Sequence, residues 1–301
     1  MSKRLPLLLT IVGPTASGKS DLAVHLARMF DGELVSADSR QVYRGMDVAT
    51  AKLYPPAPIR QHLVDVVNPD ELYSVQQFKL DAREAITSAH ARGKLPILVG
   101  GTALFIYAVV QNWKLPEVPP NETLRKQLTA DLQKRGLPFL VKQLEKLDPL
   151  AVAGIDVKNA RRVIRAIEVA SAIGNWFLQA RKKGRTHYDS LKIGITVDTE
   201  ILRERMKKRV EKMFQSGLVD ETKKLLSKYP SSRPSMSGIG YPEVSEYLKG
   251  TLTKQECIEK VVSHTYQYSK RQMTWWKKDK EIIWVKGKDE AERFIKKWVA
   301  N

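Results

Sequence analysis

The hydrophobic pattern consists of short apolar runs separated by longer stretches with helical periodicity. The runs occupy residues 5–12, 33–37, 62–67, 95–100, 191–197 and 282–285. Apolar residues spaced three and four apart mark the stretches between some of these runs, including 20–30, 75–92 and 199–216. Runs of this length are typical of buried strands, and their alternation with helices predicts an α/β fold with a mostly parallel sheet.

The alternation is interrupted after residue 113. Residues 114–120 contain three prolines, and the following stretch to about Lys183 has helical patterns without strand-like runs. Asn121 is a candidate N-cap for a helix ending at Gly136, and two further helices are expected, the last ending at Gly174. We therefore expect a core formed by residues 1–113 and 191–301, with a helical insertion at 114–190.

Composition narrows the class of protein. Hydrophobic residues make up 43% of the 301 residues, which excludes a disordered chain. The single cysteine, Cys257, excludes an intramolecular disulfide and a multi-thiolate zinc site, and it favours a reducing, cytoplasmic location. No apolar stretch approaches the ~20 residues of a membrane span, and the run at 5–12 leads into a glycine-rich loop instead of a signal-peptide cleavage site. No membrane association is expected.

Charge is distributed unevenly. The chain carries a net charge of +18, but residues 1–112 hold 12 Lys and Arg against 10 Asp and Glu. The remaining residues hold 39 against 23, a net charge of +16. A localised basic excess predicts a polyanionic partner, with nucleic acid favoured over a surface that is basic only for solubility.

A phosphate-binding loop follows the first apolar run. The sequence GPTASGKS matches the pattern G-x-x-x-x-G-K-[ST] between a predicted strand and a predicted helix. Such a loop turns backbone N–H groups and the helix N-terminus toward phosphate oxygens, while Lys19 adds charge and the Ser20 hydroxyl is placed to ligate Mg²⁺. The predicted diphosphate-binding residues are Gly13, Pro14, Thr15, Ala16, Ser17, Gly18, Lys19 and Ser20. The motif predicts a diphosphate or triphosphate without specifying ATP.

Two further strand ends carry candidate site residues. Asp38 follows the run at 33–37, where it is suited to ligate Mg²⁺, to accept a proton or to cap a turn. Asp65 is a rival strand-end acid. Thr102 follows the run at 95–100 and either donates to a phosphate or caps the next helix, and the local pattern favours the cap.

Arg205 and Arg209 lie four residues apart in the helix predicted at 199–216. A helix after a late core strand can return arginines to a phosphate site, where they would stabilise a leaving oxyanion. The alternative is a solvated basic face, which the spacing alone favours.

A resemblance to a known family removes several of these alternatives. GPTASGKS, SADSRQVYRGMDVATAK, HLVDV, LVGGTALF, SGIGY and SKRQMTWW occur in the order found in the tRNA dimethylallyltransferases. The similarity covers nearly the whole chain. It implies a P-loop NTPase-like core that transfers a dimethylallyl group from dimethylallyl diphosphate to the exocyclic amine of the adenosine 3′ to a tRNA anticodon. It also implies Mg²⁺ as cofactor, a monomer and no zinc.

The resemblance also implies roles for individual residues. Asp38 matches the general base, and Thr102 matches a contact to the diphosphate and substrate. Arg209 best matches the essential helix arginine; Arg205 is the nearby alternative for that position and is assigned to diphosphate binding. The implied tRNA-binding residues are Asp38, Ser39, Arg40, Gln41, Thr102, Arg161, Arg162, Val163, Ile164, Arg165, Gly240, Tyr241, Lys270 and Arg271. The insertion would clamp the anticodon loop.

The chain departs from the family pattern at three places. These are residues 236–238 (Met-Ser-Gly), residues 175–177 (Asn-Trp-Phe) and Phe105, which stands where Tyr is frequent. Two other functions share the phosphate loop: a small-molecule or nucleoside kinase, and an RNA-binding ATPase switch. The basic excess counts against the kinase, because a small substrate does not need it.

Overall fold

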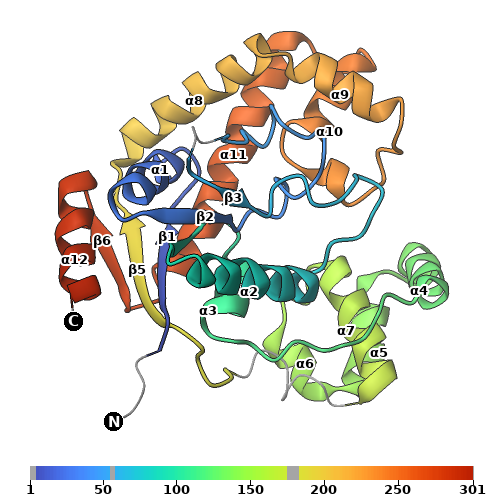
Figure 1. The fold of residues 1–301 in the computed structure, drawn as a ribbon. Coiled ribbons are helices and arrows are strands. Elements are labelled where there is room, and N and C mark those ends of the chain that lie inside the picture. Colours follow the sequence, from blue (N-terminus) through green and yellow to red (C-terminus); the bar gives the residue numbers. More distant parts are fainter. Residues whose placement is uncertain (1–4, 55–57, 175–182, 301) are drawn as a thin grey trace. The chain divides into compact units, whose positions relative to one another are not determined.

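A single parallel sheet forms the centre of the larger part of the chain. The computed structural model describes residues 5–54, 58–174 and 183–300. The strands are β1 (Leu7–Val12), β2 (Gly32–Ser36), β3 (Gln61–His62), β4 (Leu95–Val99), β5 (Asp189–Ile195) and β6 (Ile282–Val285). They pair in the order β3-β2-β4-β1-β5-β6, and every pairing is parallel (Figure 1). The predicted α/β fold is confirmed.

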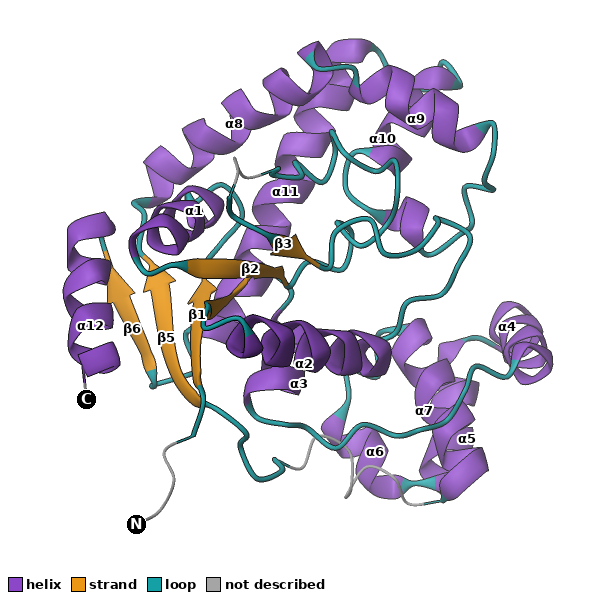
Figure 2. Cartoon of the chain, viewed as in Figure 1, coloured by secondary structure: helices purple, strands orange, loops and turns teal. Residues whose placement is uncertain are grey.

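Helices cover the sheet, as Figure 2 shows. The helices in this part of the chain are α1 (Lys19–Met29), α2 (Val75–Ala91), α3 (Ala103–Val110), α8 (Thr199–Gln215), α9 (Leu218–Leu226), α10 (Tyr241–Leu248), α11 (Lys254–Trp276) and α12 (Lys288–Ala300). Of these, α9 and α10 lie beyond the sheet and pack on α8 and α11. Leu9 and Ile11 of β1 pack with Leu26 of α1 and Ile295 of α12. Burial of β1, β2 and β4 is nearly complete, as expected for parallel strands covered on both faces.

Phe105 of α3 has a packing role. Its ring stacks on Phe78 of α2 with centroids 4.0 Å apart, and both side chains are buried. The departure from the family's frequent Tyr at this position therefore lies in the core between two helices.

The chain divides into two compact units. One contains residues 1–110 and 187–301, and the other contains residues 111–186. The second unit is helical, with α4 (Glu122–Arg135), α5 (Leu137–Leu147), α6 (Pro149–Gly154) and α7 (Ala160–Ile173) around its own apolar core. Asn121 caps α4 by accepting the Leu124 N–H at 3.0 Å. The short helix α6 was not anticipated, and the unit begins and ends three to four residues before the expected bounds of 114 and 190.

One predicted strand is largely wrong. The apolar run at 62–67 contributes only His62 to β3, because Leu63 and Asp65 have positive φ values of 62° and 56°. Left-handed residues break the extended backbone that a strand requires. Asp65 therefore does not end a strand, and its carboxylate instead contacts the Lys52 ammonium.

No described helix combines the length and the hydrophobicity needed to cross a bilayer.

Candidate active site

The loop between β1 and α1 has the geometry of an anion cradle. Gly13 and Gly18 have φ values of 148° and 91°, and Gly18 is the N-cap of α1. Lys19 folds back so that its ammonium donates to the Pro14 carbonyl at 2.7 Å. The Ser17 hydroxyl is buried without a hydrogen-bond partner among the described residues. A buried hydroxyl without a partner, in a loop that leads into a helix N-terminus, fits a phosphate oxygen.

Two half-buried cations, Lys19 and Arg209, give this site an excess of positive charge. Burial and the nearby Arg209 lower the pKa of Lys19 to about 7, against a smaller raising effect of Asp38. Burial also lowers the pKa of Arg209, whose Nε has no hydrogen-bond partner within the described chain. Desolvated cations with unfilled donors favour an anionic ligand, so these residues fit a diphosphate.

Two cavities meet at Asp38 and Arg209. The larger cavity, about 530 Å³, is lined by the phosphate loop together with Asp38, Arg205 and Arg209. The smaller, about 260 Å³, is lined by Asp38, Arg209 and residues that include Ser39, Arg40, Gly238, Tyr241, Tyr268 and Arg271. The Asp38 carboxylate therefore borders both a phosphate-binding space and a second space on another side.

Asp38 performs one of the roles considered for it, the turn cap. Its Oδ1 accepts the Arg40 N–H at 2.8 Å, so one oxygen caps the turn after β2. The residue is half-buried and also lines both cavities. Burial and the Asp38 charge raise the pKa of Tyr268 to about 12, which keeps that neighbouring phenol neutral.

Thr102 holds the Asp38 turn from the neighbouring strand. Its Oγ1 accepts the Ser39 N–H at 3.1 Å and lies 3.5 Å from the Ser39 hydroxyl. The Thr102 hydroxyl thus joins the β4–α3 turn to the turn after β2. The sequence did not predict this contact. Thr102 also stands at the expected start of α3, where its carbonyl accepts the Ile106 N–H at 3.2 Å.

Arg40 and Gln41 are engaged with the protein itself. The Arg40 guanidinium donates to the Pro234 carbonyl at 2.6 Å and to the Ser237 hydroxyl at 3.0 Å. It therefore holds the segment containing the departure at 236–238. The Gln41 amide donates to the Thr50 carbonyl at 3.2 Å and accepts the Ser36 hydroxyl at 2.8 Å.

Gln272 is a residue that sequence reasoning missed. It is buried in α11, where its Oε1 accepts the Thr15 N–H at 2.8 Å and its Nε2 donates to the Gly101 carbonyl at 2.9 Å. A Cβ on Gly101 would lie 2.1 Å from that Nε2, so a side chain there would displace the Gln272 amide. The signal in the sequence that could have identified Gln272 is its position: it is an amide side chain among the buried residues of α11, between Ser269 and Trp276.

The insertion arginines differ in exposure. Arg161 and Arg162 are exposed on α7, whereas Arg165 bonds the buried Glu168 carboxylate and the Val118 carbonyl. Val163 corrects the sequence assignment: it is fully buried in the core of this unit, so its side chain offers no surface to RNA. Ile164 is half-buried and packs against the same core. Residues 175–177 lie outside the described residues.

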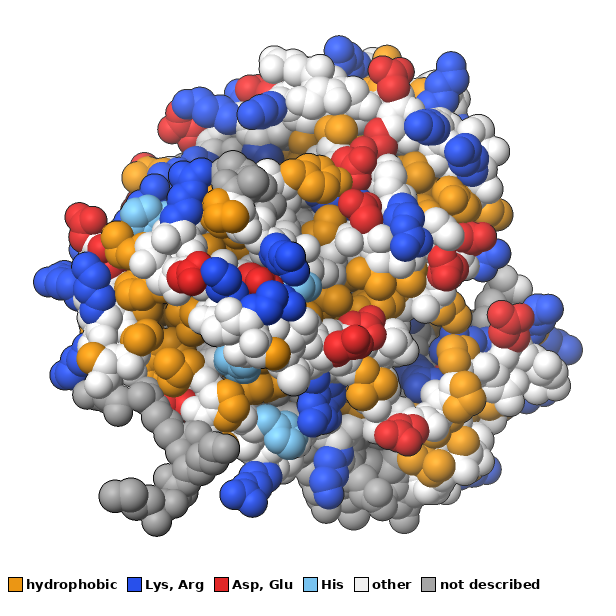
Figure 3. Space-filling view, in the orientation of Figure 1, with side chains coloured by type: hydrophobic (Ala, Val, Ile, Leu, Met, Phe, Trp, Pro, Cys, Tyr) orange, Lys and Arg blue, Asp and Glu red, His pale blue; other side chains and the backbone are white. Residues whose placement is uncertain are grey.

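The remaining implied tRNA contacts fall on α10 and α11. Gly240 is buried and donates its N–H to Glu243, and the buried Tyr241 donates its hydroxyl to Glu221 at 2.8 Å. Lys270 and Arg271 are exposed. Their cationic groups lie 4.7 and 5.7 Å from the ring centroids of Tyr266 and Tyr268, respectively. In the face shown in Figure 3, Lys and Arg side chains are spread over much of the surface.

The residues present fit a magnesium ion that is held mainly by the oxygens of a bound diphosphate. Ser20 and Asp38 line the same cavity as the phosphate loop. Within the described residues no three His, Cys, Asp or Glu side chains form a metal cluster. Mg²⁺ commonly binds through one or two protein oxygens, phosphate oxygens and water, so Ser20 with a diphosphate is a sufficient donor set.

Comparisons with known proteins match most of this chain to one family. A family model described as "IPP transferase" matches residues 41–279. A tRNA dimethylallyltransferase of Roseiflexus castenholzii is 43% identical over 92% of this chain and 91% of its own length. A tRNA dimethylallyltransferase of Halalkalibacterium halodurans is 40% identical over 92% and 90%.

Solved structures show the same fold. The tRNA isopentenylpyrophosphate transferase from Bacillus halodurans superposes with a TM-score of 0.71 at 37% identity, over 98% of this chain and 95% of that one. A eukaryotic dimethylallyltransferase acting on tRNA gives a TM-score of 0.73 at 28% identity, over 90% and 69%. The cradle, its two desolvated cations and these matches over most of the chain lead to one conclusion: this protein belongs to the IPP transferase family.

Proposed function

We propose that this chain is a tRNA dimethylallyltransferase. It moves the dimethylallyl group of dimethylallyl diphosphate to the exocyclic amine of the adenosine 3′ to the anticodon and releases diphosphate. The observation that carries the proposal is the position of Asp38 between the two cavities. A carboxylate placed there borders both a diphosphate donor in the larger cavity and an acceptor base in the smaller one.

The chain's residues have separate tasks in this reaction. The bond between the prenyl carbon and the diphosphate oxygen breaks, and a bond from that carbon to the adenine nitrogen forms. Backbone N–H groups of the loop, Lys19 and Arg209 hold the diphosphate and stabilise the charge that develops on it. Arg205, at the exposed side of the same cavity, adds a further contact. Mg²⁺ at Ser20 supplies additional neutralisation of the diphosphate when bound.

Asp38 accepts the proton that the adenine amine loses. The amine is a weak nucleophile because its lone pair is delocalised into the ring. A positioned base contributes roughly 10²–10⁴ in rate to such a step. Thr102 supports this role indirectly, because its hydroxyl fixes the backbone next to Asp38.

The tRNA is bound through the basic part of the chain. The exposed Arg161, Arg162, Lys270 and Arg271 contact backbone phosphates. Asp38, Ser39, Arg40 and Tyr241 line the cavity that receives the base, and Gln41 and Gly240 are their neighbours in the chain. The target base leaves its stack to enter that cavity. The proposed enzyme acts as a cytoplasmic monomer.

Label transfer tests the proposal directly. The protein is incubated with dimethylallyl diphosphate labelled in the prenyl group, Mg²⁺ and unmodified tRNA, and label is measured in the RNA. We expect label in RNA, and none when guanosine replaces the adenosine 3′ to the anticodon. Phosphoryl transfer from ATP to a small molecule, or RNA-stimulated ATP hydrolysis, without any label in RNA would overturn the proposal.

A further inference from the structure

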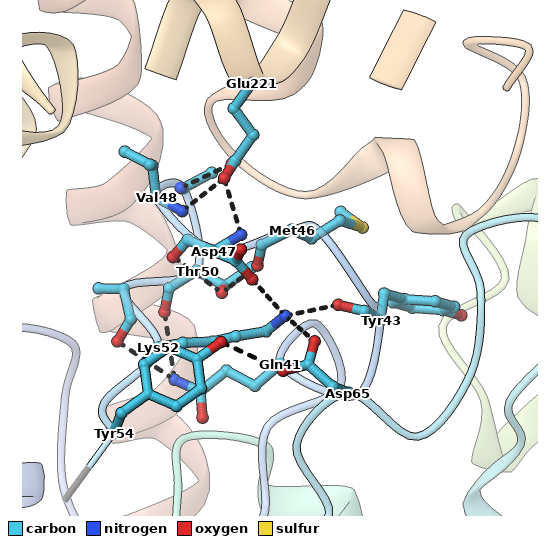
Figure 4. Close-up of polar contacts among 12 residues, drawn as sticks. Gln41, Tyr43, Met46, Asp47, Val48, Thr50, Lys52, Tyr54, Asp65 and Glu221 are labelled. Carbon is cyan, nitrogen blue, oxygen red and sulfur yellow. Dashed lines mark hydrogen bonds and ion pairs between the residues drawn. The ribbon is translucent and has the colours of Figure 1, made fainter. Parts of the chain in front are cut away.

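A carboxylate on α9 joins segments that are far apart in the sequence. Glu221 accepts the backbone N–H groups of Asp47 at 2.8 Å, Val48 at 2.7 Å and Ala49 at 3.2 Å (Figure 4). It also accepts the Tyr241 hydroxyl at 2.8 Å. Burial and this carboxylate raise the pKa of Tyr241, so the phenol stays a donor. Four donors thus converge on one acceptor.

The segment held by Glu221 forms part of the wall of both cavities. Ala49 and Thr50 line the smaller cavity, while Thr50, Ala51 and Lys52 line the larger one. The Gln41 amide donates to the Thr50 and Ala51 carbonyls, at 3.2 and 3.4 Å. A displacement of residues 47–49 would therefore reach the turn that contains Asp38, through Gln41.

Lys52 fixes the other end of the segment. Its side chain is fully buried, and its ammonium donates to the Tyr43 carbonyl at 2.7 Å and to the Asp47 and Asp65 carboxylates at 2.6 and 2.5 Å (Figure 4). The Tyr54 hydroxyl also contacts Asp65, at 3.1 Å. The Lys52 contacts join residues that are close together in the sequence, whereas Glu221 binds the segment from helix α9.

Close packing places α9 and α10 directly on this segment. A Cβ on Gly240 would lie 3.3 Å from Ala49 Cβ and 3.6 Å from the Leu218 side chain. Val48 and Ala49 pack against Leu218 and Val244. The apolar contacts bring the helices to the segment, and the Glu221 carboxylate then fixes its backbone position.

We propose that Glu221 is a positioning residue for prenyl transfer, an inference that rests on the proposed function. A carboxylate suits the position because it only accepts hydrogen bonds and all its partners here donate. Glutamine has nearly the same shape, but it would turn an amide donor toward at least one of these donors. Glu221→Gln therefore loosens residues 47–49 without creating a cavity.

The test compares Glu221→Gln with Asp220→Asn. Asp220 is exposed on the same helix, so its substitution makes the same charge change without touching the segment. Hydrogen exchange of the peptide covering residues 47–49 is measured first, because it does not depend on activity. Single-turnover transfer, the KM for dimethylallyl diphosphate, inorganic diphosphate binding and thermal unfolding follow.

We expect faster exchange at 47–49 in Glu221→Gln, and a kcat/KM lower by about 10- to 100-fold, the cost typical of a small misplacement of reacting groups. The KM for dimethylallyl diphosphate rises and kcat falls, while tRNA affinity stays near that of the wild type. Asp220→Asn changes none of these. A general loss of folded protein would instead lower kcat in proportion to the unfolded fraction and leave the KM unchanged.

Tyr241→Phe keeps the test usable if Glu221→Gln does not fold. It removes one of the four donors, and a smaller change in the same direction is expected. Unchanged exchange at 47–49, or unchanged transfer by a variant with faster exchange, would overturn the inference. A wild-type protein that fails to transfer label would overturn the proposed function, and exchange at 47–49 would still report separately on the Glu221 contacts.

Discussion

At the scale of single residues, the Asp38 carboxylate has one oxygen bound to its own turn, and the residue borders both cavities. Asp38→Asn keeps the shape of the side chain and removes its ability to accept a proton. We expect the rate of transfer to fall roughly 10²–10⁴-fold, while tRNA affinity stays close to that of the wild type. Single-turnover transfer and filter binding measure the two quantities.

The exposed Asp70 provides a matched control, since Asp70→Asn makes the same chemical change away from the cavities. Normal turnover by Asp38→Asn would rule out the general-base assignment.

The lowered pKa of Lys19 predicts that diphosphate binding depends on pH. Its pKa in the unliganded protein is about 7, against an ordinary value of 10.5. A bound diphosphate favours the ammonium and raises this pKa, so binding above pH 7 takes up a proton. Affinity is therefore greatest when Lys19 is already protonated and falls as the pH rises above about 7.

Calorimetry in buffers of different ionisation enthalpy measures this proton uptake. Lys19→Met binds more weakly and shows only the uptake that belongs to the diphosphate itself. Equal proton uptake by the wild type and Lys19→Met at pH 8 would refute the prediction.

At the scale of elements, most regular structure follows the local pattern. The helices expected at 20–30, 75–92 and 199–216 match α1, α2 and α8 to within one residue. Their apolar stripes and capping residues lie within the elements themselves, which makes them readable from sequence. The run at 62–67 had the same apolar character, but left-handed residues ended the strand after His62. The positive φ values of Leu63 and Asp65 could not be predicted from the identity of these residues.

Glu168 secures the helical unit between α4 and α7. Its carboxylate is 1% exposed and accepts hydrogen bonds from Arg125, Arg165 and the Asn121 N–H. We expect Glu168→Gln to lower the free energy of unfolding of this unit by about 1–3 kcal/mol. The substitution replaces hydrogen bonds between charged groups with weaker ones, and the NH₂ group of the new glutamine side chain would face hydrogen-bond donors. Hydrogen exchange across residues 121–173 measures the change.

Glu145→Gln is the control, because Glu145 is exposed on α5 of the same unit. Equal exchange protection in the two variants would show that the Glu168 contacts contribute nothing.

At the scale of the whole molecule, the excess of +16 in residues 113–301 predicts salt-dependent binding of tRNA. Each phosphate contact contributes about 0.7–0.9 to the slope of log affinity against log salt. The double substitution Arg161→Ala/Arg162→Ala should lower that slope by about one to two units and weaken binding of different tRNAs similarly.

Lys94→Ala is the matched control, because Lys94 lies at the amino end of β4, away from the carboxyl edge of the sheet, and pairs with Asp31. An unchanged slope in the Arg161/Arg162 variant would show that these arginines do not contact the RNA.

The sequence by itself determined the phosphate loop, the α/β alternation, the helical insertion pattern and Asp38 as a strand-end acid. Each depends on residues close together in the chain: glycines around a lysine, apolar spacing, or an acid directly after an apolar run. Only the tertiary structure decided which polar groups are partners. Gln272 meets Thr15 across 257 residues, and Glu221 meets Asp47 across 174. The tertiary structure also brings Arg209 close to Lys19 and Asp38, and places the Arg40 guanidinium against Pro234 and Ser237. These contacts between distant segments leave no local pattern in the sequence.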